Sequence, residues 1–144
     1  MDDEMPIDEL VRRLGDLTLP NQLFRHRDHL RFAHHCLLRD GWPFALDAVS
    51  EQIARFARHH GQAQKFHATM TECWVRLVAG ALAGEPRDCS FEQLVARHPQ
   101  LLDKSLPLRY YSRERLFGEA ARVRWLEPDR RALPRCPIHR GVAA

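Results

Sequence analysis

The chain lacks a hydrophobic run that is long enough to cross a membrane. Its longest apolar stretch, residues 75–83, is far shorter than the roughly 20 residues that a bilayer requires, and Arg76 interrupts it. The first residues, Met-Asp-Asp-Glu-Met, are acidic where a secretory or transit peptide would be basic. These absences predict a cytoplasmic protein that does not associate with membranes.

The chain also lacks paired cysteines and a basic stripe. None of Cys36, Cys73, Cys89 and Cys136 stands in a Cys-x-x-Cys pair, so all four are expected to be reduced thiols. The net charge of +3 comes largely from arginines that are spread through the chain and concentrated between residues 130 and 140. Because these arginines do not form one stripe with interleaved aromatic residues, nucleic-acid binding is not indicated.

Alternating strand patterns are absent too, and helical periodicity dominates instead. Glycine follows the longer periodic segments, for example at Gly15, Gly41 and Gly61, where it suits a helix end. The later pattern is shorter and more broken, with Ser90 placed to cap one of its pieces. The sequence predicts main helices near residues 7–14, 27–39, 43–60 and 63–83, and shorter helical pieces near 90–98, 101–111, 112–117 and 119–125.

A chain of 144 residues fits one ordinary globular domain with a substantial core. We expect an all-α fold, a compact single-domain helical bundle of about four main helices plus short C-terminal helices. Its expected parts are a short N-terminal helix and loop (1–19), the helical domain (20–134) and an irregular basic tail (135–144). No heptad pattern fixes an oligomeric state, so a homodimer stays open.

Three histidines are the most informative residues. Stepping back one helical turn from Leu30 and Ala33 places His26 and His29 on the inner face of the second helix, and His67 falls on the apolar face of the fourth. Neutral imidazole is a common metal ligand, and three protein ligands that leave a position open are the usual form of a catalytic metal site. The three histidines therefore predict a site for a divalent transition metal, with zinc or iron favoured.

Other residues are candidates to support this site or to bind a substrate there. They lie near the three histidines in the sequence or carry hydroxyl groups: His60, Lys65, Thr71, Tyr110 and Tyr111. Cys136-Pro137-x-His139 is similar to the Cys-Pro dipeptide of some haem-responsive proteins, which makes haem a less favoured cofactor. His34 and His35 are expected to be a solvated pair.

Short motifs stand at several points along the chain. They are Phe24-x-His26-x-x-His29-Leu30, Arg55-Phe56-Ala57-x-x-His60-Gly61, Lys65-Phe66-His67-x-Thr69-x-Thr71, Leu101-Leu102-Asp103, Tyr110-Tyr111-Ser112 and Glu127-Pro128-Asp129. Together they resemble a family of small, uncharacterised, all-helical bacterial proteins. The similarity covers about residues 20–134 and implies no activity, cofactor or site residue.

Two interpretations of function stay open. In the first, the protein binds a metal through His26, His29 and His67. This interpretation includes a metal-dependent enzyme in which metal-bound water or dioxygen does the chemistry. In the second, the protein is a non-catalytic binding or interaction module, because an inward histidine is often only hydrogen-bonded to a carbonyl or hydroxyl group. The chain lacks the H-E-x-x-H pattern that would favour a metal strongly, and it does not indicate which small molecule or protein is the partner.

Overall fold

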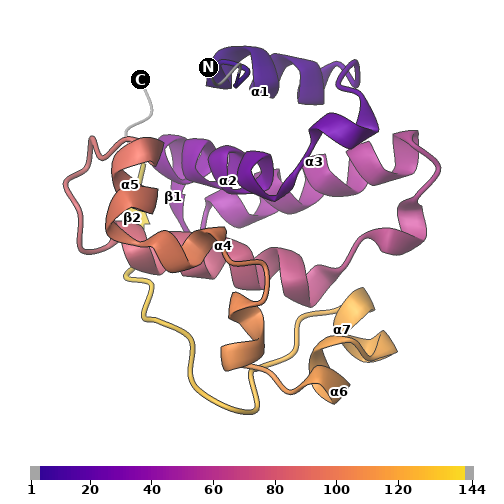
Figure 1. Ribbon diagram of the computed structural model, residues 1–144, viewed down its shortest axis with the longest axis vertical. Helices are drawn as coiled ribbons and strands as arrows, with labels where there is room; N and C mark the ends of the chain where they lie inside the picture. Colours follow the sequence, from indigo (N-terminus) through magenta and orange to yellow (C-terminus); the bar gives the residue numbers. More distant parts are fainter. Residues whose placement is uncertain (1–3, 142–144) are drawn as a thin grey trace.

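The computed structural model describes residues 4–141 and is all-helical apart from one very small sheet (Figure 1). The ends of the predicted N-terminal segment (1–19) and of the predicted tail (135–144) lie outside the described residues. The α-helices are α1 (Ile7–Gly15), α2 (His26–Asp40), α3 (Ala45–His59), α4 (Ala68–Leu82), α5 (Phe91–Arg97), α6 (Arg113–Leu116) and α7 (Glu119–Val123). The 3₁₀ helices are η1 (Asn21–Leu23), η2 (Ala63–Lys65), η3 (Pro99–Leu102) and η4 (Leu106–Arg109), and the strands are β1 (Gly41–Trp42) and β2 (His139–Arg140).

Glycine and serine set several of these helix ends, as the sequence predicts. Gly41 and Gly61 follow α2 and α3 with φ angles of +81° and +70°, a region that a residue without Cβ adopts easily. At the start of α5, the hydroxyl of Ser90 accepts from the backbone N–H of Gln93 (3.1 Å). The Gln93 side chain accepts from the backbone N–H of Ser90 in return (3.0 Å). The predicted all-α fold is confirmed.

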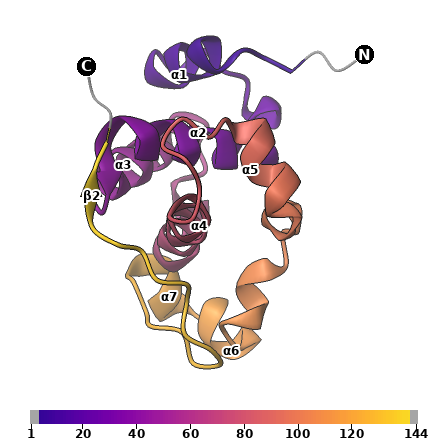
Figure 2. The same cartoon turned by 90° about the vertical axis from the view of Figure 1, so that its left-hand side faces the viewer.

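Helices α2, α3 and α4 pack against one another around one apolar core. In Figure 2, α4 lies at the centre, α2 and α3 lie on one side of it, and α6 and α7 lie on the opposite side. Fully buried residues come from all parts of this arrangement, including Leu30 and Leu37 of α2, Val49 of α3 and Val75 of α4. The core therefore extends from the long helices to the short C-terminal ones.

Residues 124–141 are irregular except where β2 forms an antiparallel pair with β1. Gly41 lies opposite Arg140, and Trp42 lies opposite His139. The tail also passes close to α4, since a Cβ on Gly80 would lie 2.8 Å from the Cβ of Pro134. Two-residue strands are too short to show alternation in a sequence, which is why the prediction missed them.

Three helix boundaries differ from the prediction. The fourth helix begins at Ala68 rather than near residue 63, because residues 63–65 form the separate turn η2. Pro43 precedes α3 instead of opening it, and its peptide bond with Trp42 is cis. The predicted piece at 101–111 is divided between η3 and η4.

Candidate ligand-binding cavity

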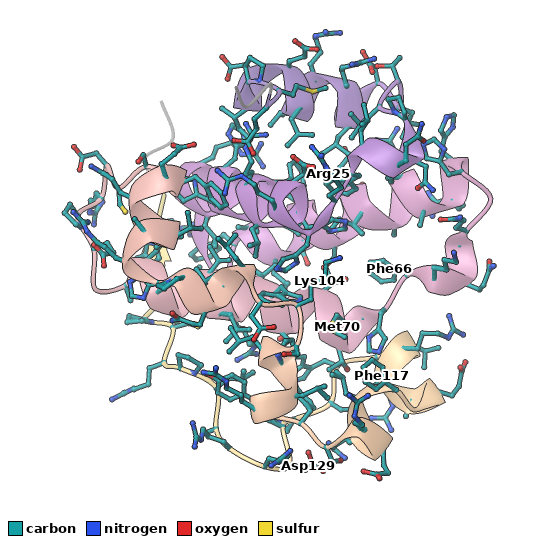
Figure 3. All side chains as sticks on the ribbon, in the orientation of Figure 1. Arg25, Phe66, Met70, Lys104, Phe117 and Asp129 are labelled. Atoms are coloured by element: carbon teal, nitrogen blue, oxygen red, sulfur yellow. The ribbon has the colours of Figure 1, made fainter. Side chains whose placement is uncertain are left out.

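A cavity of about 480 Å³ lies where the starts of α2 and α4 approach the middle of α3. Its walls come from η1 and the first half of α2, from α3, from η2 and the first half of α4, and from the single residue Lys104 after η3. Figure 3 shows Arg25, Phe66, Met70 and Lys104 around this space. His26, His29 and His67 all line it.

His67 is held by hydrogen bonds through both of its ring nitrogens. It is the N-cap residue of α4 rather than a residue on the helix face, and its Nδ1 accepts from the backbone N–H of Met70 (2.9 Å). Its Nε2–H donates to the carbonyl oxygen of Leu116 (2.7 Å). Because one nitrogen accepts and the other donates, the ring is neutral in this arrangement. The sequence prediction that places His67 on the fourth helix is therefore wrong, since the helix starts one residue later.

His26 also connects the cavity to a distant part of the chain. It is the first residue of α2, and its Nε2–H donates to the carbonyl oxygen of Leu101 (2.9 Å). Its ring meets the ring of Trp74 at an edge, with the centroids 4.5 Å apart. Burial lowers the pKa of His26. A neutral imidazole here donates one hydrogen bond that joins α2 to η3.

His29 lies one turn further along α2 and stacks on an aromatic ring. The rings of His29 and Phe24 are nearly parallel, with an interplanar angle of 13° and centroids 3.8 Å apart. Phe24 in turn meets Phe56 of α3 edge to face. Burial, with a smaller effect from the charge of His26, lowers the pKa of His29 to about 4. His29 is therefore neutral at pH 7.

The three histidines line one cavity without converging on one point as a ligand set. Within residues 4–141, no group of three or more His, Cys, Asp or Glu side chains is placed to hold a metal ion. Two acidic residues on the helices that carry or follow these histidines form ion pairs with arginine. Asp28 pairs with Arg25 and Arg31, and Glu72 pairs with Arg76.

The charged residues of the cavity are all basic. Arg25, Lys65 and Lys104 line it, and none of the described lining residues carries a carboxylate. Arg25 is partly neutralised by Asp28, with 3.3 Å between its Nε and Oδ2 of Asp28. Lys65 and Lys104 are exposed, and neither forms an ion pair with another residue in the described part of the chain.

Lys65 and Lys104 are the only lysines in the sequence, among 22 basic residues of which the others are arginines. Both of them line the same cavity. Sequence reasoning singled out Lys65 but missed Lys104, Arg25 and Phe66. The scarcity of lysine is a signal that could have drawn attention to Lys104, whereas Arg25 and Phe66 carry no comparable signal.

The other candidates from the sequence divide into two groups. Lys65 and Thr71 line the cavity. His60, Tyr110 and Tyr111 do not line it. The ring of His60 donates to the carbonyl oxygen of Leu19 (3.1 Å), and the buried Tyr111 donates its hydroxyl to the carbonyl oxygen of Leu126 (2.6 Å).

Two further histidine and cysteine predictions have clear outcomes. His34 is buried and its Nε2–H donates to the carbonyl oxygen of Cys89 (2.9 Å), so the prediction of a solvated pair with His35 is wrong. The α2 residue His34 faces α5, which the periodicity of α2 alone did not reveal. The four cysteines are free thiols, as predicted, and Cys136 donates to the carbonyl oxygen of Arg76 (3.3 Å).

Comparisons with other proteins give no further indication of function. No family model, curated protein or solved structure matches this chain. The resemblance suggested by the short motifs therefore stays a prediction. Among the described helices, none is long and apolar enough to span a bilayer.

Proposed function

We propose that the protein binds a small amphipathic anion, a molecule with an apolar body and one acidic group, in the cavity between α2, α3 and α4. The observation that carries the proposal is the composition of the cavity walls. Apolar side chains and neutral imidazoles form most of the lining, and the charged side chains among the lining residues are basic. A pocket that is mostly apolar and has a few polar groups to orient the ligand is typical of small-molecule sites.

The basic residues favour an anion over a neutral ligand. Within residues 4–141, Lys65 and Lys104 have no carboxylate partner. The carboxylate of Asp103, the neighbour of Lys104, accepts from the N–H and the hydroxyl of Ser105 (2.9 and 2.7 Å). A bound carboxylate or phosphate would therefore give these ammonium groups the anionic partner that they lack. The first turns of α2 and α4 also border the cavity, and the helix dipoles add a weak positive potential at these ends.

The size of the cavity also suits this class of ligand. A volume of about 480 Å³ falls within the range of about 300–1,000 Å³ that is common for small-molecule pockets. Four large apolar side chains on its walls, Ile53, Phe66, Met70 and Trp74, are only half-buried. A bound apolar body would remove them from water, at roughly 25 cal/mol for each Å² that it covers.

Isothermal titration calorimetry with matched ligands tests the proposal. Undecanoate and 2-naphthoate each combine an apolar body with a carboxylate, and their primary amides keep the body but lose the charge. We expect each acid to bind at least fivefold more tightly than its amide, an effect of the order of one charge-assisted hydrogen bond. Equal affinity of acids and amides, or no binding of either, would contradict the proposal.

Charge variants locate the binding site. Lys65→Gln and Lys104→Gln should each weaken acid binding about fivefold and leave amide binding unchanged. Arg135→Gln is the matched control, because it removes one positive charge from a residue that does not line the cavity. If all three variants bound the acids like the wild type, the acid would not be held by the two lysines.

The scarcity of lysine allows a second test of location. Reductive methylation with formaldehyde modifies only the amino groups of Lys65, Lys104 and the chain terminus. A bound acid should slow methylation at both lysines and leave the terminal amine, an internal control, unaffected. Equal modification rates with and without the acid would place the ligand elsewhere.

Metal binding by His26, His29 and His67 is the second candidate, because three imidazoles line one cavity. Coordination of a metal by His67 would break its hydrogen bond to Leu116 or the one from the N–H of Met70. The three imidazoles would also have to move closer to one another to share one ion. Elemental analysis of the purified protein, alongside His26→Ala and His29→Ala, is its test. Near-stoichiometric zinc or iron that both variants lose would support the metal site, and metal-free folded protein after reconstitution would overturn it.

A further inference from the structure

We infer that the apolar body of the ligand is a planar aromatic ring system rather than an alkyl chain. This inference rests on the proposed function and names the ligand class as aromatic carboxylates. Its basis is the unusual number of flat side chains on the cavity walls. Phe24, Phe56, Phe66 and Trp74 line the cavity together with the three imidazoles, so seven of its lining residues carry planar rings.

The rings form a connected arrangement. Phe24 stacks on His29 with centroids 3.8 Å apart and meets Phe56 edge to face at 5.0 Å. Trp74 of α4 meets His26 of α2 at an edge. Aromatic rings attract one another in stacked or edge-to-face arrangements beyond their apolar contact, and an alkyl chain does not gain this contribution.

Of the phenylalanine and tryptophan rings on the walls, two are incompletely covered by the protein. Phe66 and Trp74 are half-buried, whereas Phe24 and Phe56 are buried. Phe66 comes from the segment after η2 and Trp74 from α4, so the incompletely covered rings stand on different segments of the wall. A flat ligand that lies against them would complete the network of rings.

A rigid ring also loses less entropy on binding than a chain. Immobilising an alkyl chain restricts many rotatable bonds, whereas an aromatic acid has one rotatable bond between its ring and its carboxylate. Lys65 immediately precedes Phe66 in the sequence, and both the cation and the partly covered ring line the cavity. This juxtaposition fits a carboxylate attached directly to a ring.

Calorimetric comparison of 2-naphthoate with undecanoate tests the inference, since the two acids contain the same number of carbon atoms. We expect 2-naphthoate to bind wild-type protein at least fivefold more tightly. If both acids bind and undecanoate binds equally or more tightly, the aromatic class is wrong and the anion-binding proposal stands. If neither acid binds, the anion-binding proposal itself fails, and the aromatic class fails with it.

Ring variants identify the contact surface. Phe66→Leu and Trp74→Leu keep an apolar side chain but remove a ring, and each should weaken 2-naphthoate about fivefold and undecanoate less than twofold. Met70→Leu is the matched control, because Met70 is a half-buried lining residue without a ring. Circular dichroism establishes that each variant is folded, and Phe66→Leu, outside the helices, serves as the test if Trp74→Leu does not fold. Equal losses for both acids in Phe66→Leu would show that the ring contributes only apolar area, and would overturn the inference.

Discussion

Acid should destabilise the protein through His29 over a defined pH range. The folded protein holds this imidazole neutral beside Phe24 and lowers its pKa to about 4, compared with an ordinary value of 6.5. Between these two values the unfolded chain binds a proton at His29 and the folded protein does not. The contribution of His29 to stability is therefore fully present above about pH 6.5 and is lost as the pH falls toward 4.

The size of the effect follows from the two pKa values. One pKa unit corresponds to about 1.4 kcal/mol, so the complete loss is about 3 kcal/mol. Most of it, about 2.5 kcal/mol, should already be lost at pH 4.5. This is a large share of the 5–15 kcal/mol that typically separates folded from unfolded domains.

Urea denaturation at several pH values between 7 and 4.5 measures this effect when the wild type is compared with His29→Phe. Phenylalanine keeps a ring that can stack on Phe24 but cannot take up a proton. The free energy of unfolding of His29→Phe should fall by about 2.5 kcal/mol less than that of the wild type over this range. His59→Gln is the control, since His59 is an exposed histidine on α3.

Burial also lowers the pKa of His26, His34 and His35, so some acid sensitivity will remain in the variant. The informative quantity is therefore the difference between the two proteins and not the total loss. If the wild type and His29→Phe lose the same free energy between pH 7 and pH 4.5, His29 is not held neutral by burial and the reasoning is refuted.

Three further predictions concern the contacts that close the fold. Thr69→Val should lower the free energy of unfolding in urea by about 1–3 kcal/mol, because the Thr69 hydroxyl donates to the carbonyl oxygen of Arg124 (2.7 Å) and accepts from the N–H of Leu126 (3.0 Å). Thr71→Val is the control and should change the free energy of unfolding by less than about 1 kcal/mol. Gly41→Ala should separate β2 from β1 and speed tryptic cleavage at Arg140, because the φ of +81° disfavours alanine and the new Cβ would overlap the carbonyl oxygen of His139. Gly15→Ala is the control and should leave the cleavage rate unchanged, since a Cβ at Gly15 would have no atom within 4 Å. In native protein, Ellman's reagent should modify Cys136 first, since burial raises the pKa of Cys36 to about 11 and that of Cys73 to about 12. Fast reaction of Cys73 would contradict this prediction.

Local signals in the sequence were sufficient for the helices. The apolar periodicity of residues 27–39, followed by Gly41, describes α2 closely because both its buried face and its end depend on neighbouring residues. The serine at position 90 and the glutamine three residues later likewise form the expected cap. The start of α4 was misplaced because a histidine is not a usual capping residue, and its role depends on a carbonyl group 49 residues further along the chain.

The same distinction explains why the histidines were easier to find than to interpret. The inward position of His26 follows from helical spacing, whereas that of His34 does not. Their partners are carbonyl groups that lie 75 residues away for His26, 55 for His34 and 41 for His60. Four histidines of this chain thus donate a ring N–H to the carbonyl oxygen of a distant residue, which is a different role from metal binding. Spacing on a helix cannot separate the two roles, because the deciding contact lies outside the helix.

The lysines show the opposite case, in which composition indicates a site that periodicity does not. Arginine serves nearly everywhere that this chain places a basic residue, including its buried ion pairs and its cation–π contacts with Trp42 and Trp125. Arginine suits those positions because its planar, weakly hydrated fork pairs and stacks well. A lysine keeps a compact, strongly hydrated charge on a flexible stem and gains less from such contacts. The placement of both lysines on one cavity, without carboxylate partners in the described chain, is therefore more consistent with a mobile anion than with a fixed structural partner.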